Sequence, residues 1–279
     1  MANRPGIEGP EFRRLVRGDE RADLTRIALE LAQDAYPDLE MDHYLSRIDA
    51  LADRVRDRCR DGARLSQILG QINWVLYTEE GFRGNVAEYD DPRNSYLNEV
   101  LDRRLGIPIS LSVLYLAIAG RLGLAMAGVN LPGHFVIRTV AVGEPIFVDP
   151  FHEGQRLDRA GCARRVAEIF GQAVTVQEDQ LAPCQTSTIV VRMLRNLKAL
   201  YLREADYLSS LPVQRRIVAV TQGDPQERRD LGLACLHADQ PGEAISHLEA
   251  YLDAQPQAKD AAAVAALLRV AWSRVAHSN

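Results

Sequence analysis

One helical segment is apolar on nearly every side, and it constrains the fold more than any other part of the chain. The run from Leu111 to Ala119 reads Leu-Ser-Val-Leu-Tyr-Leu-Ala-Ile-Ala and contains no charged residue. A helix that is hydrophobic all round has to be covered by other elements on every side. We therefore expect a central buried helix that begins near Ser110, with the first part of the chain built around it.

The segments on either side of this helix differ in their hydrophobic period. Apolar residues recur at helical spacing between residues 11 and 76, for example over 24–32, and a short helix then leads to Arg104. After Gly123 the apolar residues become β-branched and predict strands, with Gly-Glu-Pro as one turn. The expected strands are 126–130, 134–142 and 145–148, with 173–177 as a further candidate. Helices followed by antiparallel strands indicate an α+β domain.

The last part of the chain carries a helical repeat signature. In a 34-residue window that begins at Pro225, small or apolar residues occupy key positions of a tetratricopeptide repeat. They are Leu231, Gly232, Cys235, Ala244, Leu248 and Pro256, and the preceding window retains Leu197 and Tyr201. We expect a first domain over residues 1–185, with a helical part over about 11–80 and a core over about 81–185. A tetratricopeptide-type helical domain is expected over 186–279.

Composition excludes several classes of protein. The chain has 279 residues, 47% of them hydrophobic and 25% charged, which is typical of a globular protein and not of a disordered or collagen-like one. A formal net charge of −5 gives no reason to expect nucleic-acid or anionic-membrane binding. No apolar run approaches the roughly 18 residues of a membrane span, and the first residues lack a signal-peptide pattern. We expect a cytoplasmic protein.

The four cysteines, Cys59, Cys162, Cys184 and Cys235, lie far apart and form no CxxC pair. This spacing argues against a structural zinc site and against a disulfide framework.

A histidine and an acidic residue lie at the ends of two expected strands. His134 follows Asn130-Leu131-Pro132-Gly133, and Asp149 comes fifteen residues later in Phe147-Val148-Asp149-Pro150. Antiparallel strands joined by a tight turn bring their far ends together, so the two side chains are expected to be neighbours. A carboxylate beside an imidazole orients the ring and raises its basicity, as in a catalytic triad.

Three strings of residues stand out around the central helix and the histidine. They are Asn94-Ser95-Tyr96-Leu97-Asn98, Arg104-Leu105-Gly106-Ile107-Pro108-Ile109-Ser110-Leu111-Ser112 and Gly128-Val129-Asn130-Leu131-Pro132-Gly133-His134-Phe135. In these strings the chain resembles the bacterial SirB family, which lies within the transglutaminase-like superfamily. The resemblance covers roughly residues 30–260. It implies an α+β transglutaminase-like (papain-like) core with N-terminal helices, followed by an all-α tetratricopeptide tail.

The resemblance also implies a Cys-His-Asp triad, and here the sequence departs from the superfamily. His134 and Asp149 match the histidine and the acid, whereas the expected cysteine position falls on Pro108 or, with a two-residue shift, on Ser110. None of the four cysteines lies near this point of the sequence. A thiol is partly ionised at neutral pH and intrinsically nucleophilic, whereas a serine needs a strong base and an oxyanion hole. The absence of a cysteine at this position therefore argues against thiol-dependent transamidation.

Three functional hypotheses follow, and the third is a scaffold without a functional cleft. The first is a non-catalytic protein-binding or regulatory module. The second is an amide-bond hydrolase or acyl transferase in which Ser110 attacks, His134 acts as base and Asp149 orients it. The alternative interpretation of Ser110 is a helix cap. We expect a protein or peptide partner at the tail and at the cleft, whose candidate lining residues are Asn94, Asn98, Arg104 and Asn130.

The sequence predicts neither a metal nor another cofactor. His134, Asp149, His152 and Glu153 would provide suitable ligand types for a metal ion. Many unrelated residues reach such a spacing across a hairpin, so the signal for a metal site is weak, and the usual interpretation of His152 and Glu153 is a solvated loop.

Overall fold

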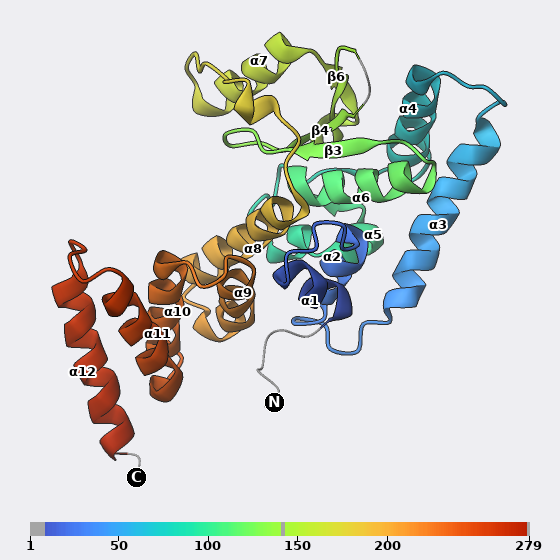
Figure 1. Ribbon diagram of the computed structural model, residues 1–279. Helices are drawn as coiled ribbons and strands as arrows, with labels where there is room; N and C mark the ends of the chain where they lie inside the picture. The colour runs from blue at the N-terminus through green and yellow to red at the C-terminus, as the bar shows by residue number, and fades with distance from the viewer. Residues whose placement is uncertain (1–8, 141–142, 278–279) are drawn as a thin grey trace. The chain divides into compact units, whose positions relative to one another are not determined.

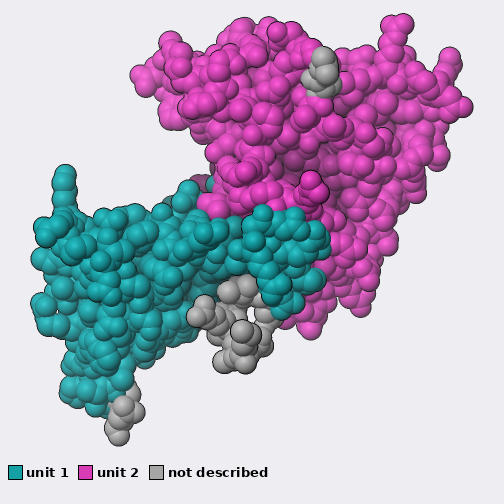
Figure 2. All heavy atoms as spheres, in the orientation of Figure 1, with its two compact units in different colours: residues 1–19, 194–279 teal, residues 20–193 magenta. Residues whose placement is uncertain are grey.

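The computed structural model describes residues 9–140 and 143–277. Its described residues form two compact units, coloured separately in Figure 2. The core unit comprises Glu20–Met193. The repeat unit comprises the chain up to Asp19 together with the chain from Leu194 onward.

The core unit begins with helices that follow the apolar spacing of the sequence. They are α2 (Leu24–Ala32), α3 (Met41–Arg58) and α4 (Leu65–Asn73), and α4 continues into a π-helical turn, η1 (Trp74–Glu79). The Asp23 side chain accepts hydrogen bonds from the backbone N–H groups of Thr25 and Arg26 at the start of α2. This cap satisfies two of the N–H groups that a helix start leaves unpaired, and α2 covers the stretch 24–32 whose apolar spacing predicts a helix.

The central helix, α6 (Pro108–Arg121), is buried along almost its whole length, as predicted. It contacts α2, α3 and α5 (Leu97–Arg103) as well as two strands of the sheet. The helix begins two residues before the predicted start, with Pro108 at the first helical position. The N–H group of this position has no partner within a helix, so a proline, which has no N–H, is tolerated there. Arg104, which ends α5, has a left-handed backbone with φ of 60°.

The main sheet is antiparallel with strand order β3-β4-β5-β6. Its strands are β3 (Met126–Val129), β4 (Val136–Thr139), β5 (Phe147–Asp149) and β6 (Gln155–Leu157). Helix α6 contacts β3 and β4, and α7 (Arg159–Phe170) packs on the sheet through Cys162 and Val166, so the sheet lies between the two helices (Figure 1). Ile137 pairs with Val148, which aligns β4 and β5 as a hairpin.

The strand expected over 173–177 is wrong, because this segment is irregular and the fourth strand is β6. Val174 and Val176 do pack against the apolar cluster under the sheet. The alternation of apolar residues in this segment therefore reflects a partly buried loop, which has no neighbouring strand to pair with. Residues 141 and 142 of the expected strand 134–142 lie outside the described residues. A short parallel pair, β1 (Arg83–Gly84) and β2 (Leu105–Gly106), and three 3-10 turns complete this unit: η2 (Pro92–Ser95), η3 (Pro150–His152) and η4 (Asp179–Leu181).

The repeat unit is all-helical. Helix α8 (Thr186–Arg203) begins in the core unit and ends in this one. The other helices are α1 (Pro10–Val16), α9 (Tyr207–Val220), α10 (Pro225–His237), α11 (Pro241–Ala254) and α12 (Ala261–His277). The predicted domain boundary at 185/186 directly precedes α8 and stays a prediction.

Helices α10 and α11 approach each other closely at Gly232. A Cβ atom added there would lie 2.6 Å from Leu248 Cδ2 and 3.4 Å from the Ala244 carbonyl oxygen. Leu248 itself is fully buried. The small residue and the leucine therefore fit together as the repeat pattern predicts.

Candidate functional site

The site centres on a buried histidine–aspartate contact. His134 precedes β4 and Asp149 ends β5, and His134 Nε2 lies 3.0 Å from Asp149 Oδ2. The His134 side chain is 3% exposed and that of Asp149 is fully buried. The hairpin thus brings the two predicted residues together, but it does so beneath the surface.

Asp149 contacts two further cationic or potentially cationic side chains. His152 Nδ1 lies 2.8 Å from Asp149 Oδ2, and Arg165 Nε from α7 lies 3.0 Å from the same oxygen. His134 Nε2 and Arg165 Nε lie close to this oxygen, but neither nitrogen is aligned with it for a hydrogen bond. Burial by itself would raise the pKa of Asp149, but its contacts with His134 and His152 outweigh burial and lower that pKa. The aspartate is a buried anion shared by three nitrogen groups.

Sequence reasoning did not find the roles of His152 and Arg165. His152 follows Asp149 by three residues in the η3 turn, and this spacing is a signal that could have paired them. Arg165 lies sixteen residues beyond Asp149, on a helix that the sequence analysis did not predict. Nothing in the local sequence marks it as the partner of the buried acid.

Aromatic rings surround the histidines. Phe151 lies edge-on to His134, with ring centroids 6.2 Å apart, and Tyr89 lies edge-on to Phe151 at 6.1 Å. A Cβ atom on Gly84 would come within 2.5 Å of the Phe151 ring, so only glycine allows β1 to pack against this ring. His152 is the exposed member of the group, with 39% of its side chain accessible.

The arrangement does not fit a divalent metal ion. His134, Asp149 and His152 each offer one ligand atom, and these atoms lie within 4.8 Å of one another. Zinc commonly takes histidine and carboxylate ligands of this kind. However, the Arg165 guanidinium contacts the same carboxylate oxygen, so an ion there would lie against a permanent positive charge. Glu153, the other predicted candidate, does not belong to the group.

Ser110 lies at the start of α6, and its hydroxyl is engaged with the backbone. The Oγ atom donates a hydrogen bond to the Asn94 carbonyl oxygen at 2.6 Å and accepts one from the Ile107 N–H at 3.0 Å. The residue is 1% exposed. Accepting from the residue that precedes the helix is one half of a capping box, so Ser110 ties the helix start to the loop before α5. Pro108, the other position matched to the cysteine, is also buried.

The four predicted cleft residues differ in their burial and in their partners. Asn94 is fully buried, and its Nδ2 donates to the Glu88 carbonyl at 2.6 Å. Arg104 is half exposed and pairs with Glu80 at 3.0 Å. Within the residues that the structure describes, no hydrogen bond or ion pair links any of the four to His134 or Asp149.

The other two cleft candidates have different surroundings. Asn98 is 4% exposed, lacks a hydrogen-bond partner for Oδ1, and lines a separate hollow beside Tyr36 and His43. The Asn130 side chain accepts from Arg192, which also donates to the Leu131 carbonyl at 2.9 Å. Arg192 therefore fixes the loop that leads to His134. A shared cleft for the four residues stays a prediction.

None of the four thiols is activated, and all four are free cysteines. Burial raises the pKa of Cys162 to about 12, with the Asp149 charge adding to the shift. Burial also raises the pKa of Cys184 to about 11, that of Cys235 to about 12, and that of Cys59 above its ordinary value. Since the thiolate is the nucleophile, the raised pKa values do not favour any of the four thiols as a nucleophile.

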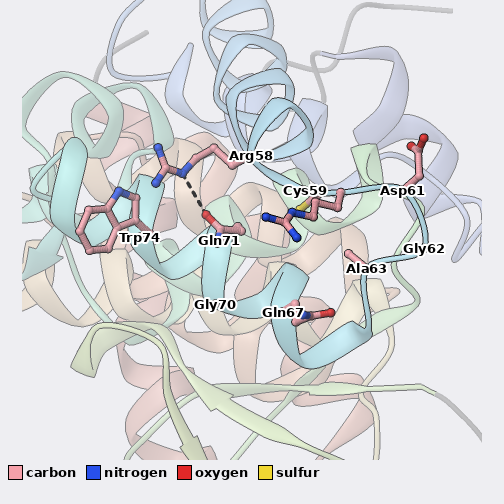
Figure 3. A pocket seen from close by; sticks show the side chains of 10 residues that line it. Arg58, Cys59, Asp61, Gly62, Ala63, Gln67, Gly70, Gln71 and Trp74 are labelled. Atoms are coloured by element: carbon pink, nitrogen blue, oxygen red, sulfur yellow. Dashed lines mark hydrogen bonds between the residues drawn. The ribbon is translucent and has the colours of Figure 1, made fainter.

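A separate hollow of about 660 Å³ lies at the turn between α3 and α4 (Figure 3). Arg58 reaches over the Trp74 ring and donates to the Gln71 side chain at 2.9 Å. Glu79 pairs with the same arginine at 2.7 Å. The charge that lines this side of the hollow is thus already neutralised within the chain.

Comparison with known proteins defines the class. Residues 42–195 match the model of a transglutaminase-like superfamily domain, and residues 197–269 match a tetratricopeptide repeat. The chain is therefore a transglutaminase-like protein with a tetratricopeptide tail, and the α+β core with a helical tail is confirmed. It belongs to the SirB family, whose curated members carry the name UPF0162 protein.

The relatives differ in how much of the chain they share. A UPF0162 protein of Xylella fastidiosa (strain 9a5c) is 35% identical over 243 residues, which cover 85% of this chain and 86% of the relative. A UPF0162 protein of Vibrio cholerae is 32% identical over 159 residues, or 57% of this chain and 58% of the relative. F-box only protein 21 of Mus musculus is 37% identical over 147 residues, or 50% of this chain and 22% of the relative. No solved structure gives a significant match.

Within the described residues, none of the helices combines the length and the apolar character needed to cross a membrane.

Proposed function

We propose that this protein is a non-catalytic protein-binding or regulatory module with a transglutaminase-like fold. The proposal rests on the burial and hydrogen bonding of the residues at the start of α6, where the superfamily has its nucleophile. There Pro108 is buried, and the Ser110 hydroxyl is used in backbone hydrogen bonds to Asn94 and Ile107. A nucleophile needs an attacking lone pair that faces the substrate and a base that takes its proton. Ser110 instead donates its proton to a carbonyl oxygen.

The His134–Asp149 pair has a structural role in this proposal. Asp149 holds three elements together, since its partners lie before β4, in η3 and on α7. A buried charge that is paired on several sides is costly to disrupt. The pair therefore stabilises the end of the sheet without a reacting group beside it.

The partner is proposed to be a protein or peptide. Repeat arrays of this type present an extended face of stacked helices that suits such ligands. Exposed apolar side chains occur on the last helix, where Leu267, Val270 and Trp272 are 37%, 43% and 51% exposed. Exposed apolar groups that gather on one element commonly mark interaction surfaces. We place the protein in the cytoplasm, where four free thiols are stable.

One observation favours the enzyme hypothesis, in which the protein is an amide-bond hydrolase or acyl transferase. The contact of 3.0 Å between His134 and Asp149 is the base–orienter half of a triad. In that hypothesis Ser110 would have to leave the Asn94 carbonyl and face His134.

The experiment that separates the two is a comparison of turnover on peptide and protein amide substrates, for hydrolysis and for acyl transfer. Wild type, Ser110→Ala and His134→Ala are assayed side by side, with folding checked by circular dichroism. The binding proposal predicts the same background rate for all three proteins. Turnover by wild type that both substitutions abolish, in variants that remain folded, would establish the enzyme instead.

A further inference from the structure

A pocket of about 630 Å³ lies within the repeat unit, between α9, α10 and α11. This volume is in the range of roughly 300–1,000 Å³ that small-molecule sites occupy. Part of its wall is apolar and comes from three helices: Val16 of α1, Val218 and Ala219 of α9, and Leu231 of α10. An apolar chain placed there would be removed from water on several sides.

Two of the charged residues that line the pocket neutralise each other. Arg215 Nε lies 2.8 Å from Glu243 Oε1, and its Nη2 lies 2.6 Å from Glu243 Oε2. Such a two-point pair is among the strongest side-chain contacts. His247 Nε2 lies 3.7 Å from Glu243, while its Nδ1 has no hydrogen-bond partner. The paired Arg215 and Glu243 therefore leave no net charge between them to attract a ligand.

Arg228 is the uncompensated charge of the pocket. Its Nε donates to the Gly223 carbonyl at 3.1 Å, and its guanidinium lies so close to Gly223 that a Cβ atom there would be 2.5 Å from Nη2. Within the described residues, no carboxylate lies at ion-pair distance from this guanidinium. Packing against a glycine backbone fixes its position, and its remaining N–H groups have no acidic partner among the residues that the structure describes.

We propose that this pocket binds a carboxylate carried on an apolar chain. The planar guanidinium of Arg228 offers two parallel N–H donors, which match the two oxygens of a carboxylate. The apolar wall of Val16, Val218 and Leu231 takes the chain attached to it. One unpaired positive charge suits a singly charged acid. A free carboxylic acid and the C-terminus of a polypeptide share this chemistry.

The test is titration calorimetry on the full chain with sodium octanoate as the probe. Octan-1-ol and octylammonium serve as matched ligands without the negative charge. A short peptide that ends in leucine, with a free or an amidated C-terminus, distinguishes the second source of the carboxylate. We expect octanoate or the free-acid peptide to bind, and the uncharged and cationic ligands to bind at least about tenfold more weakly.

Two variants locate the site. Arg228→Gln removes the charge and is expected to weaken binding about tenfold or more. Ser246→Glu adds a negative charge, like that of the ligand carboxylate, at an exposed residue of the pocket rim, and it is expected to weaken binding as well. Arg269→Gln on α12 is the control, since Arg269 is exposed and does not line the pocket, and it should bind as wild type does.

Binding of neither acid by the wild type would overturn the proposal. Equal affinity for octanoate and octan-1-ol would also overturn it, because an apolar pocket alone would then explain binding. Unchanged affinity in Arg228→Gln and Ser246→Glu would place any binding elsewhere. Because Ser246 is exposed, its variant keeps the test valid if Arg228→Gln does not fold.

Discussion

Replacing Asp149 by asparagine removes the charge at the centre of the candidate site and almost none of its volume. Asp149 is fully buried, and its Oδ2 is 3.0 Å from Arg165 and 2.8 Å from His152. Removing one partner of a buried ion pair costs roughly 3–5 kcal/mol, because the other charge is left uncompensated. Arg165 is 15% exposed, so water relieves part of this cost and we expect about 3 kcal/mol.

The assay is urea unfolding of the core unit followed by tryptophan fluorescence. The chain has two tryptophans, Trp74 in the core unit and Trp272 in the repeat unit, so a Trp272→Phe background reports on the core alone. With a slope of roughly 1–3 kcal/mol per molar urea, a loss of about 3 kcal/mol lowers the midpoint by about 1–3 M. Asp57→Asn on the exposed side of α3 is the matched control and should change stability by less than about 0.5 kcal/mol.

A double-mutant cycle with Arg165→Met tests the physical reason. Removing both charges leaves no uncompensated ion, so the double variant should lose at least about 1 kcal/mol less than the sum of the two single losses. The reasoning is refuted if Asp149→Asn is as stable as Asp57→Asn. The buried acid would then contribute no stability, and the catalytic hypothesis would gain support.

Three further predictions concern the rest of the chain. Gly232→Ala should destabilise the repeat unit by about 1–2 kcal/mol relative to Gly242→Ala, because only the first added methyl meets Leu248; equal urea midpoints in a Trp74→Phe background would contradict this packing. The Arg215 hydrogen bond lowers the pKa of Glu243 to about 2, so its stabilisation of the repeat unit is present above the unfolded pKa of about 4.3 and is lost as the pH falls toward 2. In Glu243→Gln the stability of the repeat unit should fall less steeply as the pH is lowered. The same dependence of stability on pH as in wild type would contradict this role of Glu243. Native protein should react with a thiol reagent slowly and first at the partly exposed Cys59, whereas Cys162 and Cys235 should react only on unfolding; rapid modification of Cys162 would show an activated thiol.

Much of the fold is visible in the sequence where local and tertiary signals agree. Helix α2 has both an Asp23 cap and an apolar face, and it covers the stretch 24–32 that the apolar spacing marks as helical. Helix α6 has no polar face, so its burial follows from composition alone. The repeat pattern at Gly232 and Leu248 corresponds to a contact that only small residues permit.

The rest depends on contacts that leave no local pattern. Helix α7 buries only a few side chains, such as Cys162 and Val166, while Ile169 and Phe170 stay exposed, so its apolar period is weak. Because α7 was not predicted, the contact of Arg165 with Asp149 could not be predicted either. The adjacency of His134 and Asp149 followed from hairpin geometry, but their burial did not, since it depends on how η3 and α7 close over the end of the sheet.

The central claim is that Ser110 is a structural residue and not a nucleophile. Native protein can be incubated with a fluorophosphonate, which phosphonylates activated serines, and Ser110 then examined by peptide mass spectrometry. Because Ser110 is 1% exposed and its hydroxyl donates to the Asn94 carbonyl, no adduct is predicted on this residue in wild type or in His134→Ala. A stoichiometric adduct on Ser110 in wild type that is lost in His134→Ala would contradict it.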